Sequence, residues 1–212
     1  MSARALGFDG TVTEISLEGA LMRAAAGTPV VVEGLLRDAG YLDSVARTYE
    51  LSVAAVVGAD AASQLRARGL ERIHEICPPD QIAAIIGDLD QRMRPSTLPI
   101  TRAMMERIAP GLGNRYYVAN RVAVRAMVPQ HLIGAYPEIV AAGHLAGHLH
   151  ATGRHVDTDL THPYGTMVLW CAVGPVRAGN SIALYGRGRA GAPLTPALEP
   201  GDALLFDAGD PH

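Results

Sequence analysis

The end of the chain limits the fold most, because short apolar segments alternate there with glycine- and proline-rich turns. The apolar segments are GTMVLWCAVGPV (165–176), NSIALYG (180–186) and DALLFDAG (202–209), and RAGN, GRGRAGAP and LEPGD lie among them. Segments of this length between turn residues are typical of antiparallel strands. RYYVANRVAVRAMVP (115–129) adds β-branched and aromatic residues in an alternating pattern. The sequence therefore predicts a β barrel or β sandwich in the second half of the chain.

The first half of the chain has a mainly helical pattern. The clearest helix is DQIAAIIGDLDQRMR (80–94), in which apolar residues recur at helical spacing after a capping Asp80. Shorter helices are predicted over 14–25, 61–76 and about 100–108, and TPVVVEGLL (28–36) is predicted to be a buried strand. We therefore expect a single α+β domain over 1–212, helix-rich in 1–110 and with a β-barrel core in 111–212, against which the 80–94 helix packs.

The composition excludes several classes of function. The net charge of −3 and the pI of about 6.2 give no basic surface for nucleic acid. No apolar run is long enough for a membrane span or resembles a signal peptide, and two cysteines are too few for a disulfide framework. We expect a cytoplasmic protein whose two cysteines are free thiols in a reducing compartment. The abundance of alanine, glycine and arginine over lysine suggests a GC-rich bacterial genome.

A histidine and an aspartate in GRHVDTDLTHPY (153–164) have the spacing of a metal-ligand pair. His155 and Asp157 would point to the same face of a strand, because side chains at i and i+2 do so. A third ligand is needed, and His212 at the end of EPGDALLFDAGDPH is the candidate, 57 residues beyond His155. Two histidines and one carboxylate form the facial triad of non-haem Fe(II) oxygenases. The other histidines of 144–162 are expected to be loop residues.

The chain resembles the Fe(II)/2-oxoglutarate-dependent oxygenase superfamily, in particular its phytanoyl-hydroxylase-like and prolyl-hydroxylase-like branches. The resembling stretches are HVDT (155–158), MVLWCAVGPVRAGNSIALYGRG (167–188) and LEPGDALLFDAGDPH (198–212). The resemblance implies a double-stranded β-helix of the jelly-roll or cupin type. It also implies Fe(II) and 2-oxoglutarate as cofactors and His155, Asp157 and His212 as iron ligands.

The resemblance leaves the anchor of the 2-oxoglutarate carboxylate open. The superfamily places a basic residue some ten positions beyond the distal histidine, and this sequence stops at His212. We expect the domain to continue beyond this point; otherwise Arg121 or Arg125 would bind the carboxylate, because guanidinium donates two parallel hydrogen bonds. Tyr117 and Asn120 are expected beside the cofactor pocket. Thr166 is expected there too, whereas Trp170 is expected to belong mainly to the core.

The resemblance implies a dioxygenase that uses O₂ to hydroxylate or otherwise oxidise a small-molecule metabolite, in bacterial secondary metabolism. The presence of Asp157 favours oxidation over halogenation, since halogenating relatives have a small residue there. Two alternatives remain: a related oxygenase or cupin-like metal enzyme that does not use 2-oxoglutarate, and a non-catalytic binding module on the same barrel. No nucleic-acid or membrane partner is expected.

Overall fold

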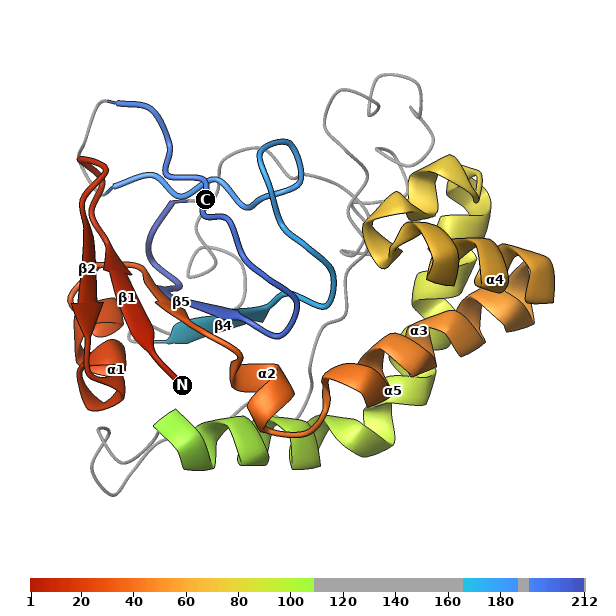
Figure 1. The fold of residues 1–212 in the computed structure, drawn as a ribbon, viewed down its shortest axis with the longest axis horizontal. Coiled ribbons are helices and arrows are strands. Elements are labelled where there is room, and N and C mark those ends of the chain that lie inside the picture. The colour runs from red at the N-terminus through yellow and green to blue at the C-terminus, as the bar shows by residue number, and fades with distance from the viewer. Residues whose placement is uncertain (109–165, 187–190, 212) are drawn as a thin grey trace. The chain divides into compact units, whose positions relative to one another are not determined.

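A computed structural model describes residues 1–108, 166–186 and 191–211, apart from the side chain of Pro79. The chain forms two compact units, each made from separate stretches of sequence. The first contains Met1–Gly40, Arg102–Val118 and Thr152–His212, and the second contains Tyr41–Thr101 and Ala119–Ala151. Helices and an antiparallel sheet are both present (Figure 1), so the predicted α+β class is confirmed.

The first unit contains one five-stranded antiparallel sheet in the order β2-β1-β3-β5-β4. The strands are β1 (Ala3–Leu6), β2 (Val12–Ile15), β3 (Val30–Val32), β4 (Met167–Cys171) and β5 (Ala203–Asp207). Over the described residues this sheet is open, with β2 and β4 as its edge strands. The expectation that helices come first and strands follow is wrong, because three of these strands come from the first 32 residues.

The two faces of the sheet pack against different parts of the first unit. Leu204 and Phe206 of β5 share one face with Val168 and Trp170 of β4, because residues paired across strands point the same way. This face is covered by an arm, residues 172–186 and 191–201, which adds Val176, Leu184, Leu194 and Leu198 to the cluster. Figure 1 shows the arm in blue on one side of β4 and β5, with α1 (Leu17–Ala25) on the other.

The arm replaces a strand that the sequence predicted over 180–186. Within 180–186, Leu184 alone forms a β-bridge, through two backbone hydrogen bonds with Leu194. Earlier in the arm, Val176 forms a second isolated bridge with Leu198 in the same way. Side-chain hydrogen bonds close the turns between these bridges: Asn180 accepts from the Arg177 amide and donates to the Pro175 carbonyl. Such local bonds compete with a regular ladder, so the arm is held by isolated bridges.

The predicted strand over 28–36 is shorter in the structure, and a helical turn follows it. Gly34 adopts φ 65°, ψ 15° and begins α2 (Leu35–Asp38) directly after the three valines of β3. The helix predicted over 14–25 is confirmed as α1, where the Ser16 hydroxyl accepts from the Gly19 amide at the N-terminus. The first residues of that prediction belong to β2 instead.

The second unit contains helices α3 (Leu42–Val56) and α4 (Ala59–Arg68), the 3₁₀ helix η1 (Leu70–Glu75) and most of α5 (Pro79–Ile108). The helix predicted over 61–76 is therefore two helices, because Gly69 at φ 105° separates them. Val45, Tyr49 and Val53 form the buried stripe of α3. Among the described helices, none combines the length and apolar character needed to cross a bilayer.

Helix α5 joins two predicted helices, 80–94 and 100–108, into one of 30 residues. Pro95 and Pro99 lie inside it, although proline removes a helical hydrogen bond and usually ends or kinks a helix. The buried stripe continues past both prolines at spacings of three and four residues: Leu89, Met93, Thr97, Ile100, Met104 and Ile108. Packing along this stripe outweighs the local cost of the prolines. The predicted packing of 80–94 on the β core stays a prediction, because 80–94 belongs to the second unit.

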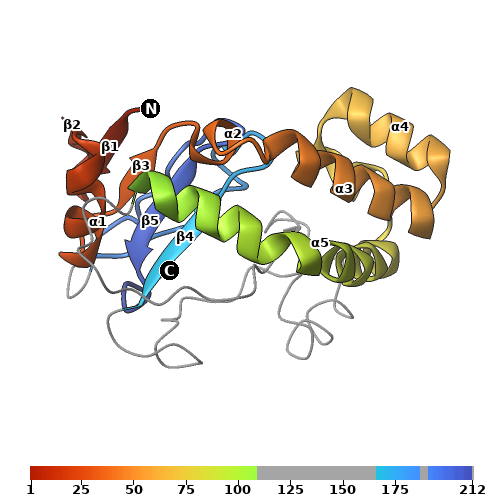
Figure 2. The ribbon, with the colours of Figure 1, turned by 90° about the horizontal axis from the view of Figure 1, so that it is seen from below.

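The thiol of Cys171 gives a testable pH dependence. Cys171 is half-buried, but its sulfur lies 3.5 Å from Met104 Sδ on the last turns of α5, which Figure 2 shows beside the sheet. Desolvation there raises the pKa of the Cys171 thiol from 9.0 to about 12. The unfolded thiol loses its proton first, so the free energy of unfolding should fall by about 1 kcal/mol per pH unit between pH 9 and 12.

Urea unfolding at several pH values measures this slope. In Cys171→Ala the slope should be smaller by this amount, while the slope from the buried Cys77 thiol, whose pKa is also raised by desolvation, remains. An unchanged slope in Cys171→Ala would show that the Cys171 thiol is solvated in the folded chain.

Candidate functional site

Of the residues predicted to form the iron and cofactor site, the structure describes only Thr166. His155, Asp157, His212, Arg121, Arg125, Tyr117 and Asn120 lie outside the described residues, as do all the other histidines except His74. Thr166 is half-buried and directly precedes β4. What the structure shows of this site is therefore the arrangement of two segments, the one that begins at Thr166 after HVDT and the one that precedes His212.

These two segments meet at one end of the sheet. Strands β4 and β5 run antiparallel, so the beginning of β4 lies beside the end of β5, where Met167 pairs with Asp207. One step further out, the Ala208 amide donates a 2.9 Å hydrogen bond to the Thr166 carbonyl. Thr166, which follows Asp157 in the sequence, and Ala208, which precedes His212, are thus hydrogen-bonded to each other.

The lengths of chain beyond this hydrogen bond allow the three ligands to meet. Asp157 is nine residues before Thr166, and His212 is four residues after Ala208. Extended chain covers at most about 3.5 Å per residue, which gives upper limits of about 32 Å and about 14 Å. Both limits greatly exceed the separation of ligands around one metal ion, so the topology is compatible with a shared site.

The turn that leads to His212 is held by a compact set of hydrogen bonds. The Asp207 carboxylate accepts a 2.7 Å bond from the Gly209 amide, and the Asp210 amide donates a 2.8 Å bond to the Asp207 carbonyl. The Pro211 carbonyl accepts a 2.7 Å bond from the Tyr185 amide of the arm. We call residues 207–211 the β5 exit turn.

At the other end of β5, the buried Asp202 carboxylate explains part of the sequence motif PGDALLF. Its Oδ1 accepts a 2.8 Å hydrogen bond from the Gly34 amide and its Oδ2 accepts a 2.8 Å bond from the Glu199 amide. Asp202 is only 4% exposed. The carboxylate therefore ties the start of α2 to the turn before β5.

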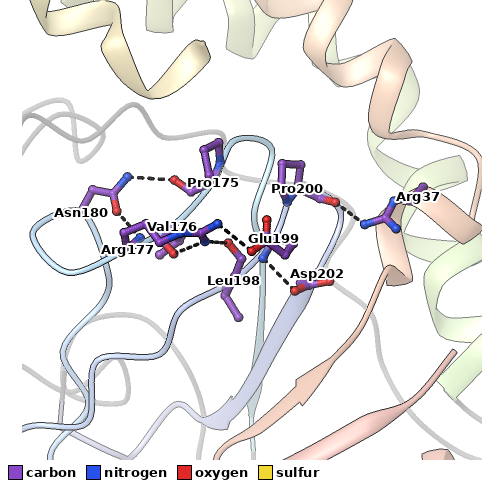
Figure 3. A network of polar contacts seen from close by, with 9 residues as sticks. All are labelled: Arg37, Pro175, Val176, Arg177, Asn180, Leu198, Glu199, Pro200 and Asp202. Atoms are coloured by element: carbon purple, nitrogen blue, oxygen red, sulfur yellow. Dashed lines mark hydrogen bonds and ion pairs between the residues drawn. The ribbon is translucent and has the colours of Figure 1, made fainter.

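Gly201 in the same motif is required by close packing. Its φ is +95°, and a Cβ built on it would lie 2.9 Å from Arg37 Cβ. The Gly201 carbonyl accepts from the Leu36 amide, and the Pro200 carbonyl accepts a 2.6 Å bond from the Arg37 guanidinium (Figure 3). Pro200, Gly201 and Asp202 thus have structural roles. The predicted iron chemistry depends on HVDT and His212.

Trp170 and Arg177 are also accounted for by packing. Trp170 is half-buried against the apolar cluster under the arm, as predicted for a core residue. Arg177 donates to the carbonyls of Val176 and Leu198 at 2.8 Å and to the Glu199 carboxylate at 2.6 Å, so its guanidinium links the two sides of the arm (Figure 3).

The described residues contain no group of three or more histidine, cysteine, aspartate or glutamate side chains that could hold a metal ion. The sequence did not predict a smaller polar group on η1, in which Glu71 Oε2 and His74 Nδ1 are buried without hydrogen-bond partners. Glu75, which accepts a 2.6 Å hydrogen bond from Arg72, lies 3.9 Å from His74 Nε2. Ordered water would satisfy such atoms.

Comparisons of the chain with protein-family models, with curated proteins and with solved structures gave no match.

Proposed function

We propose that the chain is a non-haem Fe(II)/2-oxoglutarate-dependent dioxygenase that oxidises a small-molecule metabolite. The observation that supports this most is the hydrogen bond between Ala208 and Thr166, because it joins the chain segments that lead to His212 and to the His155–Asp157 pair. The open antiparallel sheet supplies strands that a double-stranded β-helix also needs, and we propose that fold for the complete core.

The proposed ligands suit ferrous iron by their chemistry. His155 and His212 each offer a neutral ring nitrogen, and Asp157 offers a carboxylate, which together leave three positions on an octahedral ion. When bound, the iron would supply the chemistry that couples 2-oxoglutarate and O₂ to oxidation of a C–H bond. The residues of the chain orient the ligands and the substrate.

We propose Arg121 or Arg125 as the partner of the far 2-oxoglutarate carboxylate within this sequence. Guanidinium presents parallel N–H donors that match both oxygens of a carboxylate. Thr166, Tyr117 and Asn120 are proposed to line the same pocket. Of these residues Thr166 is the one whose surroundings are described, at the beginning of β4 next to the β5 exit turn.

Anaerobic absorption spectroscopy tests this function. The chain should take up one Fe(II), and addition of 2-oxoglutarate should give the weak visible charge-transfer band of a chelated 2-oxo acid. Admission of O₂ should then convert 2-oxoglutarate to succinate in an iron-dependent way. Replacing 2-oxoglutarate with N-oxalylglycine, which binds like 2-oxoglutarate but does not react, should prevent succinate formation.

The outcomes separate the alternatives. Iron uptake without a band favours a metal-dependent oxygenase or cupin-like enzyme that does not use 2-oxoglutarate. The absence of both iron uptake and the band favours a non-catalytic binding module on the same core and contradicts the proposal.

A further inference from the structure

The two prolines inside α5 lie shortly before the residue at which this helix passes from the second unit into the first. Pro95 and Pro99 belong to the second unit, which includes the helix up to Thr101, and the first unit begins again at Arg102. Figures 1 and 2 show that α5 is bent rather than straight. We infer that residues 95–99 are a hinge at which the two ends of α5 change direction relative to each other. This inference does not depend on the proposed function.

The backbone of α5 lacks two hydrogen bonds on one side of this hinge. Proline has no N–H, so Pro95 gives no hydrogen bond to the Gln91 carbonyl and Pro99 gives none to the Pro95 carbonyl, as these positions would in a regular helix. Gln91, Pro95 and Pro99 are all exposed, and a spacing of four residues places them on one face of the helix. The helix is therefore open along its solvent side over two successive turns.

The buried side of α5 keeps its contacts over the same turns. Thr97 is 2% exposed, and Met93 and Ile100 are each 3% exposed. The Thr97 hydroxyl donates a 3.1 Å hydrogen bond to the Met93 carbonyl, and the Thr101 hydroxyl donates a 2.9 Å bond to the Thr97 carbonyl. A threonine that bonds the carbonyl four residues back often bends a helix. The packed side is thus the axis of bending, and the proline side is the part that opens and closes.

The ion pairs on the surface of α5 stiffen its two ends separately. Three pairs join residues four apart on this helix, and each lies wholly before or wholly after residues 95–99: Asp88 with Arg92, Asp90 with Arg94, and Arg102 with Glu106. These pairs support the helix on either side of the hinge. None of the three bridges the missing backbone hydrogen bonds.

Each end of α5 is also fixed within its own unit. Before the hinge, Ile85 and Leu89 are completely buried. After it, Met104 Sδ lies 3.5 Å from Cys171 Sγ of β4, and both belong to the first unit. A change in the bend therefore turns one anchored end against the other. Hinge motions of this kind typically take microseconds to milliseconds.

The distance between two nitroxide labels, measured by pulsed electron paramagnetic resonance, tests the hinge. The labels would be attached at Ala84→Cys and Glu106→Cys, which are exposed positions before and after it, with Cys77 and Cys171 replaced by alanine. A straight helix would separate the two Cα atoms by about 33 Å, since each residue adds about 1.5 Å. With both prolines present, we expect a shorter mean distance and a broad distribution.

The decisive variant is Pro95→Ala/Pro99→Ala, which restores both amide donors. Its mean distance should move towards that of a straight helix, and the width of the distribution should fall by at least about a third. Leu98→Ala is the matched control, because Leu98 lies between the two prolines, is 56% exposed, and can be replaced without changing a backbone donor. Leu98→Ala should leave the mean and the width as they are.

Hydrogen exchange in the unmodified chain is a second measurement, and it needs no variant to fold. The amides of Thr97 and Ile100 should exchange at least about tenfold faster than those of Leu89 and Met104. All four residues are at most 4% exposed, so burial does not explain a difference between them.

Three results would overturn the inference. A distribution that is as narrow with both prolines as without them would show a fixed bend. A mean and a width that the double variant leaves unchanged would show that packing sets the bend without the prolines. Exchange at Thr97 and Ile100 as slow as at Leu89 and Met104 would show that the bend does not open.

Discussion

Replacing Asp157 with alanine should reduce iron-dependent conversion of 2-oxoglutarate to succinate by at least about 10³-fold. The substitution removes the carboxylate of the proposed triad, so the remaining ligands would be two neutral imidazoles. Fe(II) would then bind more weakly and with a different geometry. Iron content after anaerobic reconstitution and succinate formed per minute are the two measurements, and both should fall together.

The control for Asp157→Ala is a histidine from the same part of the sequence. His150 lies outside the HVDT motif and is expected to be a loop residue, so His150→Ala should keep iron and at least about half of the turnover. Circular dichroism and the thermal midpoint should be similar in both variants. If His150→Ala loses iron and Asp157→Ala keeps iron and turnover, the assignment of the ligands is wrong.

Replacing Asp202 with alanine should lower the free energy of unfolding by about 3 kcal/mol. Hydrogen bonds to a charged group contribute about 1.5–3 kcal/mol each, and the substitution would leave two amide donors, of Gly34 and Glu199, without their carboxylate acceptor. Asp202 is only 4% exposed, so water cannot readily take the place of its carboxylate as the acceptor for these two amides. Urea unfolding measures the loss.

Two further variants make this prediction specific. Asp202→Asn keeps the acceptor for Gly34 but turns an NH₂ group towards the Glu199 amide, so we expect a loss between zero and that of Asp202→Ala. Asp38, an exposed aspartate of α2 in the same unit, is the surface control, and Asp38→Ala should change the free energy of unfolding by less than about 0.5 kcal/mol. Equal losses in Asp38→Ala and Asp202→Ala would contradict the structural role of Asp202.

The sequence predicts elements that depend on local signals and fails where distant segments decide. The helical pattern of 14–25 correctly indicates α1, and the three valines of β3 correctly indicate a buried strand. The N-terminal hairpin was missed because β1 and β2 have only four residues each, and the residues of β2 stay mostly exposed. The pairing of β3 with β5 joins residues that no local pattern connects.

Two predictions were wrong for different physical reasons. At Pro95 the local rule predicts the end of a helix, but a continuous buried stripe carries α5 on to Ile108. At 180–186 the local pattern predicts a strand, but turn hydrogen bonds of Asn180 leave Leu184 in an isolated bridge. At Pro95 packing against the rest of the chain outweighs intrinsic preference, whereas at 180–186 local side-chain hydrogen bonds do.

The candidate site was predicted from ligand chemistry and spacing, and its ligands stay predictions. What the sequence could not supply is the contact between Thr166 and Ala208, which follows from the antiparallel pairing of β4 and β5. The sequence also could not show whether the residues of PGDALLF have structural or catalytic roles. The hydrogen bonds of Asp202 make that separation.

The pairing of β3 with β5 also has a consequence for biosynthesis. Val30 and its partner Leu205 are 175 residues apart, so β5 is synthesised long after β3. At about 5–20 residues per second, β3 waits roughly 10–35 s for its neighbour, with β1 and β2 paired on one side and an apolar edge open on the other. The nascent chain should therefore depend on a holding chaperone during synthesis, and a ribosome stalled before residue 203 should expose Val30–Val32 to protease.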